Sequence, residues 1–518
     1  MILRNFLIGG CVLSLTIFSA KYTSYGAVKK NNSKSCFVEG LLPPPPIVKG
    51  NNPTLYVGLA SHLGLKEENK NTLFLTSKHK KSLLKLTDAK GFTFESSEIT
   101  ISWESFPISS SRIISKQIIG PYASFESAQN VASRLHSKGI CAFIANPKDW
   151  EVWLPADTQI PRNLNLRTLV LNEIIKNQLK PVLITPSNKF ILSGPVLINS
   201  LDGIAWNQGI YAGPFLLQPD SYGTWTLVEK VSLENYLHGV VPYEIGSTAP
   251  KDALAAQAVL ARTWALANVK RYSIDGYHLC STTQCQVYKN PQQISKSVKN
   301  SISKTSGKVL SFNNQPIQAF YHATNGGIMA RGEEAWSMKP LPYLKVKIDS
   351  TEEMKKKYKI PMNVKQLNTF LDDREGFYGI NHKRFRWTRV LSSRQIRKYF
   401  SASEKFLDLP KEINILSRGP SGRVLALEIK GENEGSRTVL ELDAIRKTLP
   451  SLPSTLFIVK KLEDGVWQFE GGGFGHGVGL SQAGAVDLAL EGWSTEEILS
   501  HYYPGTSYGP LPQNWIAP

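Results

Sequence analysis

An alanine-rich stretch near the middle of the chain constrains the fold more than any other feature. Residues 252–266 read DALAAQAVLARTWAL. Small or apolar side chains recur on one face at helical spacing, at Leu254, Ala258, Ala261 and Ala265. Pro250 suits the first position of a helix, and Asp252 complements its positive end. We therefore predict a helix over residues 250–272 against which other elements pack closely.

Strand-like segments lie on both sides of this helix. LYVGLA starts a strand near Thr54, and short β-rich segments separated by Gly, Pro and Asn fill residues 167–236. GKVLSF and RVLALEIKG follow the helix, together with helical patterns near residues 362–371, 393–400 and 481–490. Ser494 and Glu497 form a capping box for a last helix. The predicted fold class is therefore α+β, with a mixed, sheet-rich main domain.

Composition and charge narrow the possible partners. The chain has 518 residues, of which 42% are hydrophobic and 20% are charged, so it can bury more than one core. Its formal net charge is +18, but it lacks the long basic helices interleaved with aromatics that are typical of a DNA reader. We expect no nucleic-acid partner. A positive surface suits an anionic polymer such as a cell wall, or simply keeps the protein soluble.

The N-terminus is typical of an exported protein. Residues 6–20 (FLIGGCVLSLTIFSA) form an apolar run behind Arg4, and this run is shorter than the ~20 residues that span a bilayer. A cleaved signal, an uncleaved anchor and lipidation at Cys11 all remain open. The expected location is the periplasm or cell envelope, with membrane contact only through this segment.

Six segments are expected along the chain. They are a signal peptide or anchor (1–26), a proline-containing linker (27–50), a β-rich region (51–115), a small α/β unit (116–160), a β-rich lead-in (161–224) and the main domain (225–510). In the small unit a strand-like QIIGPY precedes a helix capped by Ser124, and CAFIAN and WEVWL follow. This unit resembles part of a SPOR module, a glycan-binding domain, or is a generic α/β unit.

Four ordered motifs carry a more specific resemblance. They are VSLENYLHGVVPYEI (231–245), DALAAQAVLARTWAL (252–266), HLCSTTQCQVY (278–288), and GGGFGHGVGLSQAGA (471–485) with HYYPGT (501–506). Together they resemble the stage II sporulation protein D (SpoIID) family, which includes the LytB-type amidase enhancers. The resemblance covers about residues 225–510. It implies a peptidoglycan-directed protein, either a lytic transglycosylase or an enhancer of a separate amidase.

Glu244 is the candidate catalytic residue. It lies in VVPYEIGS, where apolar neighbours are expected to raise the pKa of its carboxyl, as a general acid requires. The resemblance places the family's proposed catalytic glutamate at this position. In that chemistry the muramic acid's own 6-hydroxyl is the nucleophile, so a single carboxyl can act as acid and then as base. The structural alternative is that Glu244 caps or salt-bridges the following helix.

His278, Cys280 and Cys285 are candidate zinc ligands. Thiolate and imidazole suit tetrahedral zinc, and members of the resembled family carry a metal here. Gln284 stands where the resemblance would allow another histidine, so His322, His476 or water would have to complete the site. The alternative is a disulfide between the two cysteines, which suits an oxidising compartment.

Four residues are candidate substrate contacts: His476, Gln482, Trp336 and Gln286. The glycines of residues 471–479 are expected to let a sugar approach the backbone, and His476 or Gln482 to bind hydroxyls or orient Glu244. His476 is alternatively a core histidine. Trp336 and Tyr343 either stack on sugars or are simply buried.

Two further residues of the alanine-rich helix match the family, and we expect both to be structural. Arg262 is predicted to hold a buried acid or the main chain, and Gln257 to pack near the site.

Three functions are compatible with these features. The first is a transglycosylase that cleaves glycan strands and leaves 1,6-anhydromuramic ends. The second is a non-enzymatic protein that binds peptidoglycan and stimulates a cell-wall amidase. The third is a wall-anchored scaffold that uses the SPOR-like unit. A Ser/His/Asp hydrolase is disfavoured because the sequence contains no nucleophile elbow.

Overall fold

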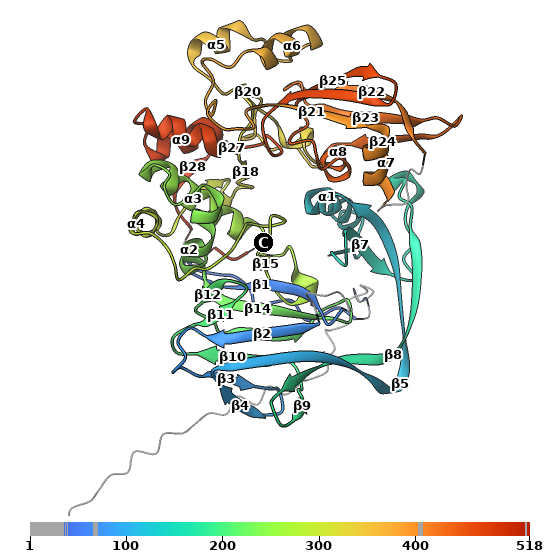
Figure 1. Cartoon of the computed structure of the whole chain (residues 1–518), viewed down its shortest axis with the longest axis vertical. Helices are drawn as coiled ribbons and strands as arrows, with labels where there is room; N and C mark the ends of the chain where they lie inside the picture. The colour runs from blue at the N-terminus through green and yellow to red at the C-terminus, as the bar shows by residue number, and fades with distance from the viewer. Residues whose placement is uncertain are drawn as a thin grey trace, which may run out of the picture. The chain divides into compact units, whose positions relative to one another are not determined.

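The computed structural model describes residues 36, 38, 40–65, 71–401, 408–512 and 515–517. The chain divides into two units, Met1–Phe37 and Val38–Pro518, and every helix and strand among the described residues lies in the second. The described residues form ten α-helices and 28 strands in several sheets, which confirms the predicted α+β class (Figure 1). None of the described helices is long and apolar enough to cross a membrane. The apolar run at residues 6–20, with Cys11, lies outside the described residues.

A seven-stranded sheet joins segments that are far apart in the sequence. Its order is β15-β1-β14-β13-β10-β3-β4, and all neighbours are antiparallel except β1 and β15. The bounds are β1 (Thr54–Leu63), β3 (Leu84–Thr87), β4 (Thr93–Ser96), β10 (Val196–Ser200), β13 (Phe215–Pro219), β14 (Trp225–Ser232) and β15 (Leu279–Cys280). The sheet therefore crosses the boundaries expected between the β-rich region, the lead-in and the main domain.

The second sheet contains two very long strands, β5 and β8. Its order is β12-β11-β2-β5-β7-β6, with β8 pairing β5 and β9 pairing β8. β5 and β8 run side by side and antiparallel along most of their length (Figure 1). The bounds are β2 (Thr72–Ser77), β5 (Glu98–Tyr122), β6 (Phe143–Ala145), β7 (Trp150–Pro155), β8 (Leu169–Ile184), β9 (Lys189–Ile191), β11 (Ile204–Trp206) and β12 (Gly209–Tyr211). The turn residues of the lead-in predict only short strands, whereas β8, which lies in the lead-in, is long.

The small α/β unit forms at the end of β5. The helix α1 (Phe125–His136) begins after Ser124, whose side chain accepts a hydrogen bond from Ser127 N. The helix presents Ala128, Val131, Ala132 and Leu135 to a core shared with Trp150 of β7. The predicted strand-helix-strand order is therefore present.

The alanine-rich segment forms α3 (Lys251–Ala267), with Pro250 immediately before it. Every side chain from Ala253 to Leu266 is buried, and α3 packs against the helices α2, α4, α9 and α10. Figure 1 shows α2 and α4 beside it. The helix bounds are α2 (Leu233–Glu244), α4 (Lys296–Lys304), α9 (Gln482–Leu490) and α10 (Thr495–Tyr502). Ser494 and Glu497 form the predicted capping box before α10.

Residues after α4 build small sheets and short helices. The sheet orders are β17-β16-β28, β18-β27, β19-β20, β21-β26-β25 and β22-β23-β24. The strand bounds are β16 (Lys308–Phe312), β17 (Gln315–Pro316), β18 (Tyr321–His322), β19 (Ile328–Met329), β20 (Lys347–Ile348), β21 (Arg386–Ser392), β22 (Pro410–Arg418), β23 (Val424–Gly431), β24 (Arg437–Glu441), β25 (Phe457–Glu463), β26 (Val466–Gly472), β27 (Leu480–Ser481) and β28 (Ser507–Pro510). The helix bounds are α5 (Glu352–Lys357), α6 (Val364–Asp372), α7 (Ser393–Ser401) and α8 (Asp443–Thr448).

Candidate active site

Glu244 is the last residue of α2, a helix that the sequence analysis did not predict. The apolar residues that bury one face of α2 follow helical spacing: Leu233, Tyr236, Leu237, Val240 and Val241. Pro242 removes a backbone donor near the end, and Gly246 continues the chain at a positive φ. The helix therefore anchors Glu244 through the preceding turns.

The Glu244 carboxylate is held by the loop that follows the disulfide. Its Oε1 accepts a hydrogen bond of 2.8 Å from Val287 N. Burial raises the pKa of Glu244, and hydrogen-bonding contacts with Val287, Gln482 and Tyr321 oppose that shift without reversing it. Among the described residues, no basic side chain forms an ion pair with this carboxylate. Glu244 neither caps nor salt-bridges α3, so the structural alternative is not realised.

A chain of hydrogen bonds continues from Glu244 into the core. The Tyr321 hydroxyl, which contacts Glu244, also donates to Gln286 Oε1 over 2.7 Å. Gln286 Nε2 donates to Ala261 O and to the Tyr236 hydroxyl at 3.2 and 3.3 Å. Because Gln286 is 1% exposed, it lies behind the site and does not face a ligand. The structure thus gives Gln286 a supporting position in place of the predicted substrate contact.

Gln482 approaches Glu244 from a different element. It is the first residue of α9, whose N-cap Ser481 accepts from Gly484 N. Its amide donates to Glu244 and, over 3.3 Å, to Gln257 Oε1. Gln257 therefore lies beside the site, as predicted.

Arg262 has the structural role that we predicted. It holds Glu234 through two hydrogen bonds of 2.6 and 2.8 Å, and it donates to the carbonyl of Lys308.

A pocket of about 590 Å³ opens beside Glu244. Its lining brings together three of the four predicted substrate contacts, His476, Gln482 and Trp336. The small α/β unit contributes Ser124 and Glu126 to the same pocket. Residues of and just before α8 also line it: Leu442, Asp443, Arg446 and Lys447. One pocket is therefore built from three distant parts of the sequence.

His476 lines the pocket, but both of its ring nitrogens already have backbone partners. Nε2 lies 3.0 Å from Tyr321 O, and Nδ1 accepts from Val478 N at 3.1 Å. Burial and the nearby charge of Arg446 lower the pKa of His476 to about 3, so the ring is neutral. Its polar atoms hold the chain in place, as the core-histidine alternative expects. Its ring centroid lies 4.7 Å from that of Trp336.

The two predicted aromatic contacts are separated in the structure. Trp336 lines the pocket and packs 4.5 Å from Phe320, measured between ring centroids. Tyr343 is buried, and its hydroxyl accepts a hydrogen bond from Gln318 N. Trp336 thus lines the pocket although it is buried, whereas Tyr343 does not line it.

The glycine-rich segment serves close chain packing. A Cβ at Gly473 would lie 2.8 Å from Thr324 O, and one at Gly479 would lie 2.1 Å from Phe320 O. Both glycines have a positive φ. The absence of side chains therefore lets this segment lie against residues 320–324, and Gly475 is the one glycine of this segment that lines the pocket, together with Phe474 and His476. This differs from the expectation that the glycines would admit a sugar.

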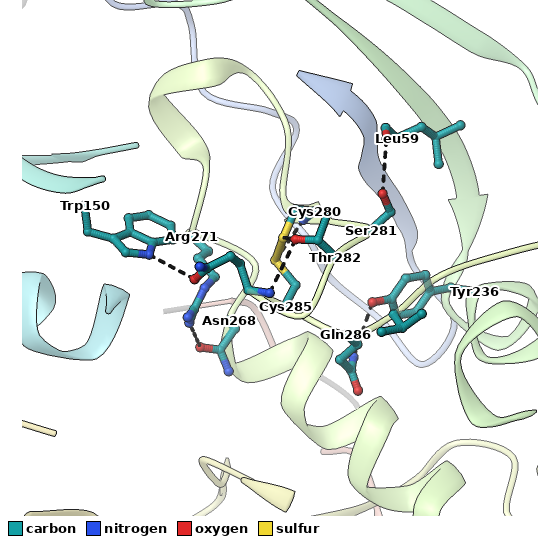
Figure 2. Close-up of a disulfide and its surroundings, with 12 residues drawn as sticks. Leu59, Trp150, Tyr236, Asn268, Arg271, Cys280, Ser281, Thr282, Cys285 and Gln286 are labelled. Carbon is teal, nitrogen blue, oxygen red and sulfur yellow. Dashed lines mark hydrogen bonds between the residues drawn. A yellow bond between two sulfur atoms is a disulfide. The ribbon is translucent and has the colours of Figure 1, made fainter. Parts of the chain in front are cut away.

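Cys280 and Cys285 form a disulfide, the second of the two predicted alternatives (Figure 2). His278 is occupied by the backbone, since Nδ1 accepts from Tyr56 N at 2.8 Å and Nε2 lies 2.9 Å from Pro46 O. Within the part of the chain that the structure describes, no group of three or more His, Cys, Asp or Glu is arranged to hold a metal ion. Zinc binding by the reduced cysteines stays a prediction.

The disulfide supports the site instead. It closes the turn that leads directly to Gln286 and Val287, the two residues that hold Tyr321 and Glu244. Figure 2 shows Gln286 beside Tyr236 on one side of the bridge and Trp150 and Arg271 on the other. The cysteine motif thus fixes the loop that contacts the candidate acid.

Two residues of the pocket, Tyr321 and Arg446, were not predicted from the sequence. Tyr321 lies in FYHATN (320–325), and the spacing of these residues alone carries no catalytic signal. Arg446 lies in AIRKTL, far along the chain from Glu244. Only the tertiary fold brings these two residues to the pocket.

Comparisons with known proteins agree with the ordered motifs. Residues 221–312 match the family described as Stage II sporulation protein, and residues 330–479 match a domain of unknown function, DUF8618. Stage II sporulation protein D of Bacillus subtilis (strain 168) is 28% identical over 295 residues, which are 54% of this chain and 75% of that protein. An uncharacterized protein of Brachyspira hyodysenteriae is 27% identical over 313 residues, 60% of this chain and 75% of its own.

The amidase enhancer of Bacillus subtilis (strain 168) is 27% identical over 295 residues, or 52% of this chain and 40% of that protein. The match at residues 221–312 contains Glu244, Gln286 and the disulfide, whereas Trp336 and Arg446 lie within the DUF8618 match. These findings confirm the predicted resemblance: the chain carries a stage II sporulation protein domain and is related to stage II sporulation protein D and to the amidase enhancer.

Proposed function

We propose that this chain is a lytic transglycosylase that cleaves peptidoglycan glycan strands, with Glu244 as general acid and then general base. The observation that carries this proposal is the position of Glu244 in the pocket wall, with a pKa raised by burial and no basic partner among the described residues. A carboxyl in such surroundings keeps its proton at a pH where an exposed glutamate has lost it.

The reaction needs one proton donor and one internal nucleophile. Protonated Glu244 donates to the glycosidic oxygen as the bond from that oxygen to C1 of muramic acid breaks. The 6-hydroxyl of the same sugar attacks C1 and gives its proton to the Glu244 carboxylate. The products are a free 4-hydroxyl and a 1,6-anhydro ring, and no water is consumed. Holding the hydroxyl within the substrate itself lowers the entropic cost of the attack.

Tyr321 suits both protonation states of Glu244. Its hydroxyl has a single proton, and Gln286 Oε1 accepts it at 2.7 Å while the Gln286 amide is held by Ala261 O. In that arrangement the Tyr321 oxygen can accept a hydrogen bond from protonated Glu244. When Glu244 becomes a carboxylate, rotation of the same hydroxyl turns the donor toward it. Tyr321 therefore acts as a positioning residue for an acid that later serves as a base.

Two other carboxylates line the pocket, and their contacts leave them less suited to catalysis. Glu126 is ion-paired with Arg271 over 3.0 Å. Asp443 interacts with the hydroxyls of Ser124 and Ser127, although burial raises the pKa of Asp443 to about 6. Ordinary glycosidases need a second carboxylate across the bond, whereas the proposed chemistry does not.

The test is the digestion of purified peptidoglycan by the wild-type chain and by Glu244→Gln. The wild type should release glycan fragments and Glu244→Gln should not, since an amide has no acidic proton to donate. Glu353→Gln on exposed α5 is the matched control and should retain activity. Equal cleavage by Glu244→Gln and wild type would exclude Glu244 as the acid.

A non-enzymatic role is the second candidate, because one related protein is named an amidase enhancer. In that case the pocket binds glycan, and the protein stimulates a separate cell-wall amidase. Adding Glu244→Gln to a purified amidase and peptidoglycan separates the two roles. Stimulation that persists in Glu244→Gln, in the absence of any glycan cleavage by the wild type, would favour the enhancer.

We also propose that the chain is exported to the cell envelope, where its polymer substrate lies. Two features support this location: the apolar run at residues 6–20, and the disulfide bonding of all four described cysteines (Cys36, Cys141, Cys280 and Cys285). Fractionation of cells that express the full chain tests it. Recovery of the protein in the cytosolic fraction alone would contradict export.

A further inference from the structure

Three cationic side chains line the pocket beside Glu244, and two of them already have acidic partners. Arg271 is paired with Glu126 over 3.0 Å, and Lys447 is paired with Asp149. Arg446 differs, because it forms no hydrogen bond or ion pair with any residue that the structure describes. Among the residues that the structure describes, the pocket therefore contains one cation without a partner.

Arg446 lacks a partner among the described residues although part of its side chain is buried. Its Nε is buried without a hydrogen-bond partner, and burial lowers the pKa of its guanidinium. The residue as a whole is half-buried, and a partly buried charge with no partner costs free energy that a bound anion would offset. A guanidinium also presents its N–H groups as a planar fork that matches a carboxylate.

The neighbours of Arg446 do not supply the missing anion. Burial, with a smaller contribution from the charge of Arg446, lowers the pKa of both His322 and His476, so both rings are neutral beside it. His322 Nε2 is likewise buried with no partner among the described atoms. Asp443 is close enough to favour the charged guanidinium, but it forms no ion pair with it within the described part of the chain.

We propose that Arg446 binds a carboxylate of the peptidoglycan strand while Glu244 acts on the glycosidic bond in the same pocket. This inference rests on the proposed function and adds the group that the pocket recognises. Two sources carry a carboxylate: the lactyl group of a muramic acid without a stem peptide, and the stem peptide itself. In either case the ligand is an acidic glycan, and Arg446 determines specificity without touching the proton that is transferred.

The experiment measures binding in the Glu244→Gln background, so that cleavage does not interfere. The probes are peptide-stripped glycan fragments, the same fragments with their carboxylates reduced to alcohols, and fragments that keep their stem peptides. Arg446→Gln should weaken binding of the carboxylate-bearing probe about 10- to 100-fold and leave the reduced probe unaffected. Arg446→Lys keeps the charge but not the planar fork of the guanidinium, so it should weaken binding less than Arg446→Gln does.

The control is Arg437→Gln, which removes the same charge from the exposed strand β24 that precedes α8 and should bind like the parent. Dependence on Arg446 for stripped fragments assigns the lactyl carboxylate, and dependence only for peptide-bearing fragments assigns the peptide. If Arg446→Gln binds every probe as tightly as its parent, the proposal is wrong. The proposed function fails separately, when wild-type protein cleaves none of the fragments.

Discussion

At the scale of single residues, the surroundings of Glu244 both raise and lower the pKa of its carboxyl. Burial raises it, while hydrogen bonds from Val287 N and from Gln482 stabilise the charged form and lower it. The sequence predicts the first effect, because Val240, Val241 and Pro242 precede the carboxyl. It does not predict the second, because Gln482 lies more than 200 residues away and meets Glu244 only in the fold.

Gln482→Leu should move the alkaline limb of the pH–activity profile to higher pH. The change removes a donor to the carboxylate and keeps the site apolar, so the pKa of Glu244 rises further. Activity requires protonated Glu244 and is lost as pH rises through that pKa, so a higher pKa preserves activity to higher pH.

The measurement is the cleavage rate across a pH series, compared with Gln178→Leu at an exposed position of β8. A limb that stays in place, or that moves to lower pH, would show that Gln482 does not stabilise the Glu244 carboxylate.

At the scale of elements, helices with a clear apolar period were easier to predict than the segments that hold the site. α3 begins where the sequence indicates but ends at Ala267, before the predicted end at residue 272, and the capping box of α10 lies where it was predicted. α2 was missed although Leu233, Tyr236, Leu237 and Val240 are spaced as in a helix. The strand pattern of the preceding residues obscures where α2 begins. Pro242 in the sequence argues against a helix that continues to Glu244.

Removing the disulfide should weaken both stability and activity. In the double variant Cys280→Ser/Cys285→Ser, the unfolded chain has more conformational freedom than in the wild type. A disulfide that closes a loop of this length contributes about 2 kcal/mol to the free energy of unfolding. The same loop presents Val287 N to Glu244 and Gln286 to Tyr321, so the cleavage rate should fall as well.

Urea unfolding and cleavage assays on the double variant provide the check. Because Cys36 and Cys141 are also disulfide-bonded, the variant is more selective than a reducing agent. Unchanged stability and rate would show that the bridge does not support the site. Stoichiometric zinc in the purified wild type would favour the metal site over the disulfide.

At the scale of the whole molecule, the sheets combine strands from different segments of those expected from sequence composition. β14 at the start of the main domain pairs with β1 and β13, and β15 pairs with β1. Turn residues and motif limits mark where a chain changes direction, but they do not reveal which strands later pair. For the same reason the sequence did not indicate that the small α/β unit would line the pocket through Ser124 and Glu126.

A fragment containing only residues 225–510 should therefore fold poorly. It exposes both edges of β14 and removes part of the core that α2 and α3 share with β1. Its circular dichroism melt should be broad or absent, whereas a fragment beginning at residue 38 should unfold cooperatively. A sharp melt for residues 225–510 at the temperature of the longer fragment would contradict this interpretation of the sheet.

The most direct test of the central claim is digestion of peptidoglycan in water enriched in oxygen-18, followed by mass spectrometry of the new glycan ends. If Glu244 protonates the leaving oxygen and the sugar's own hydroxyl attacks, each new muramic end should lack one water in mass and contain no oxygen-18. Glu244→Gln should produce no such ends. New ends that contain oxygen-18 would show that water is the nucleophile and would contradict the account.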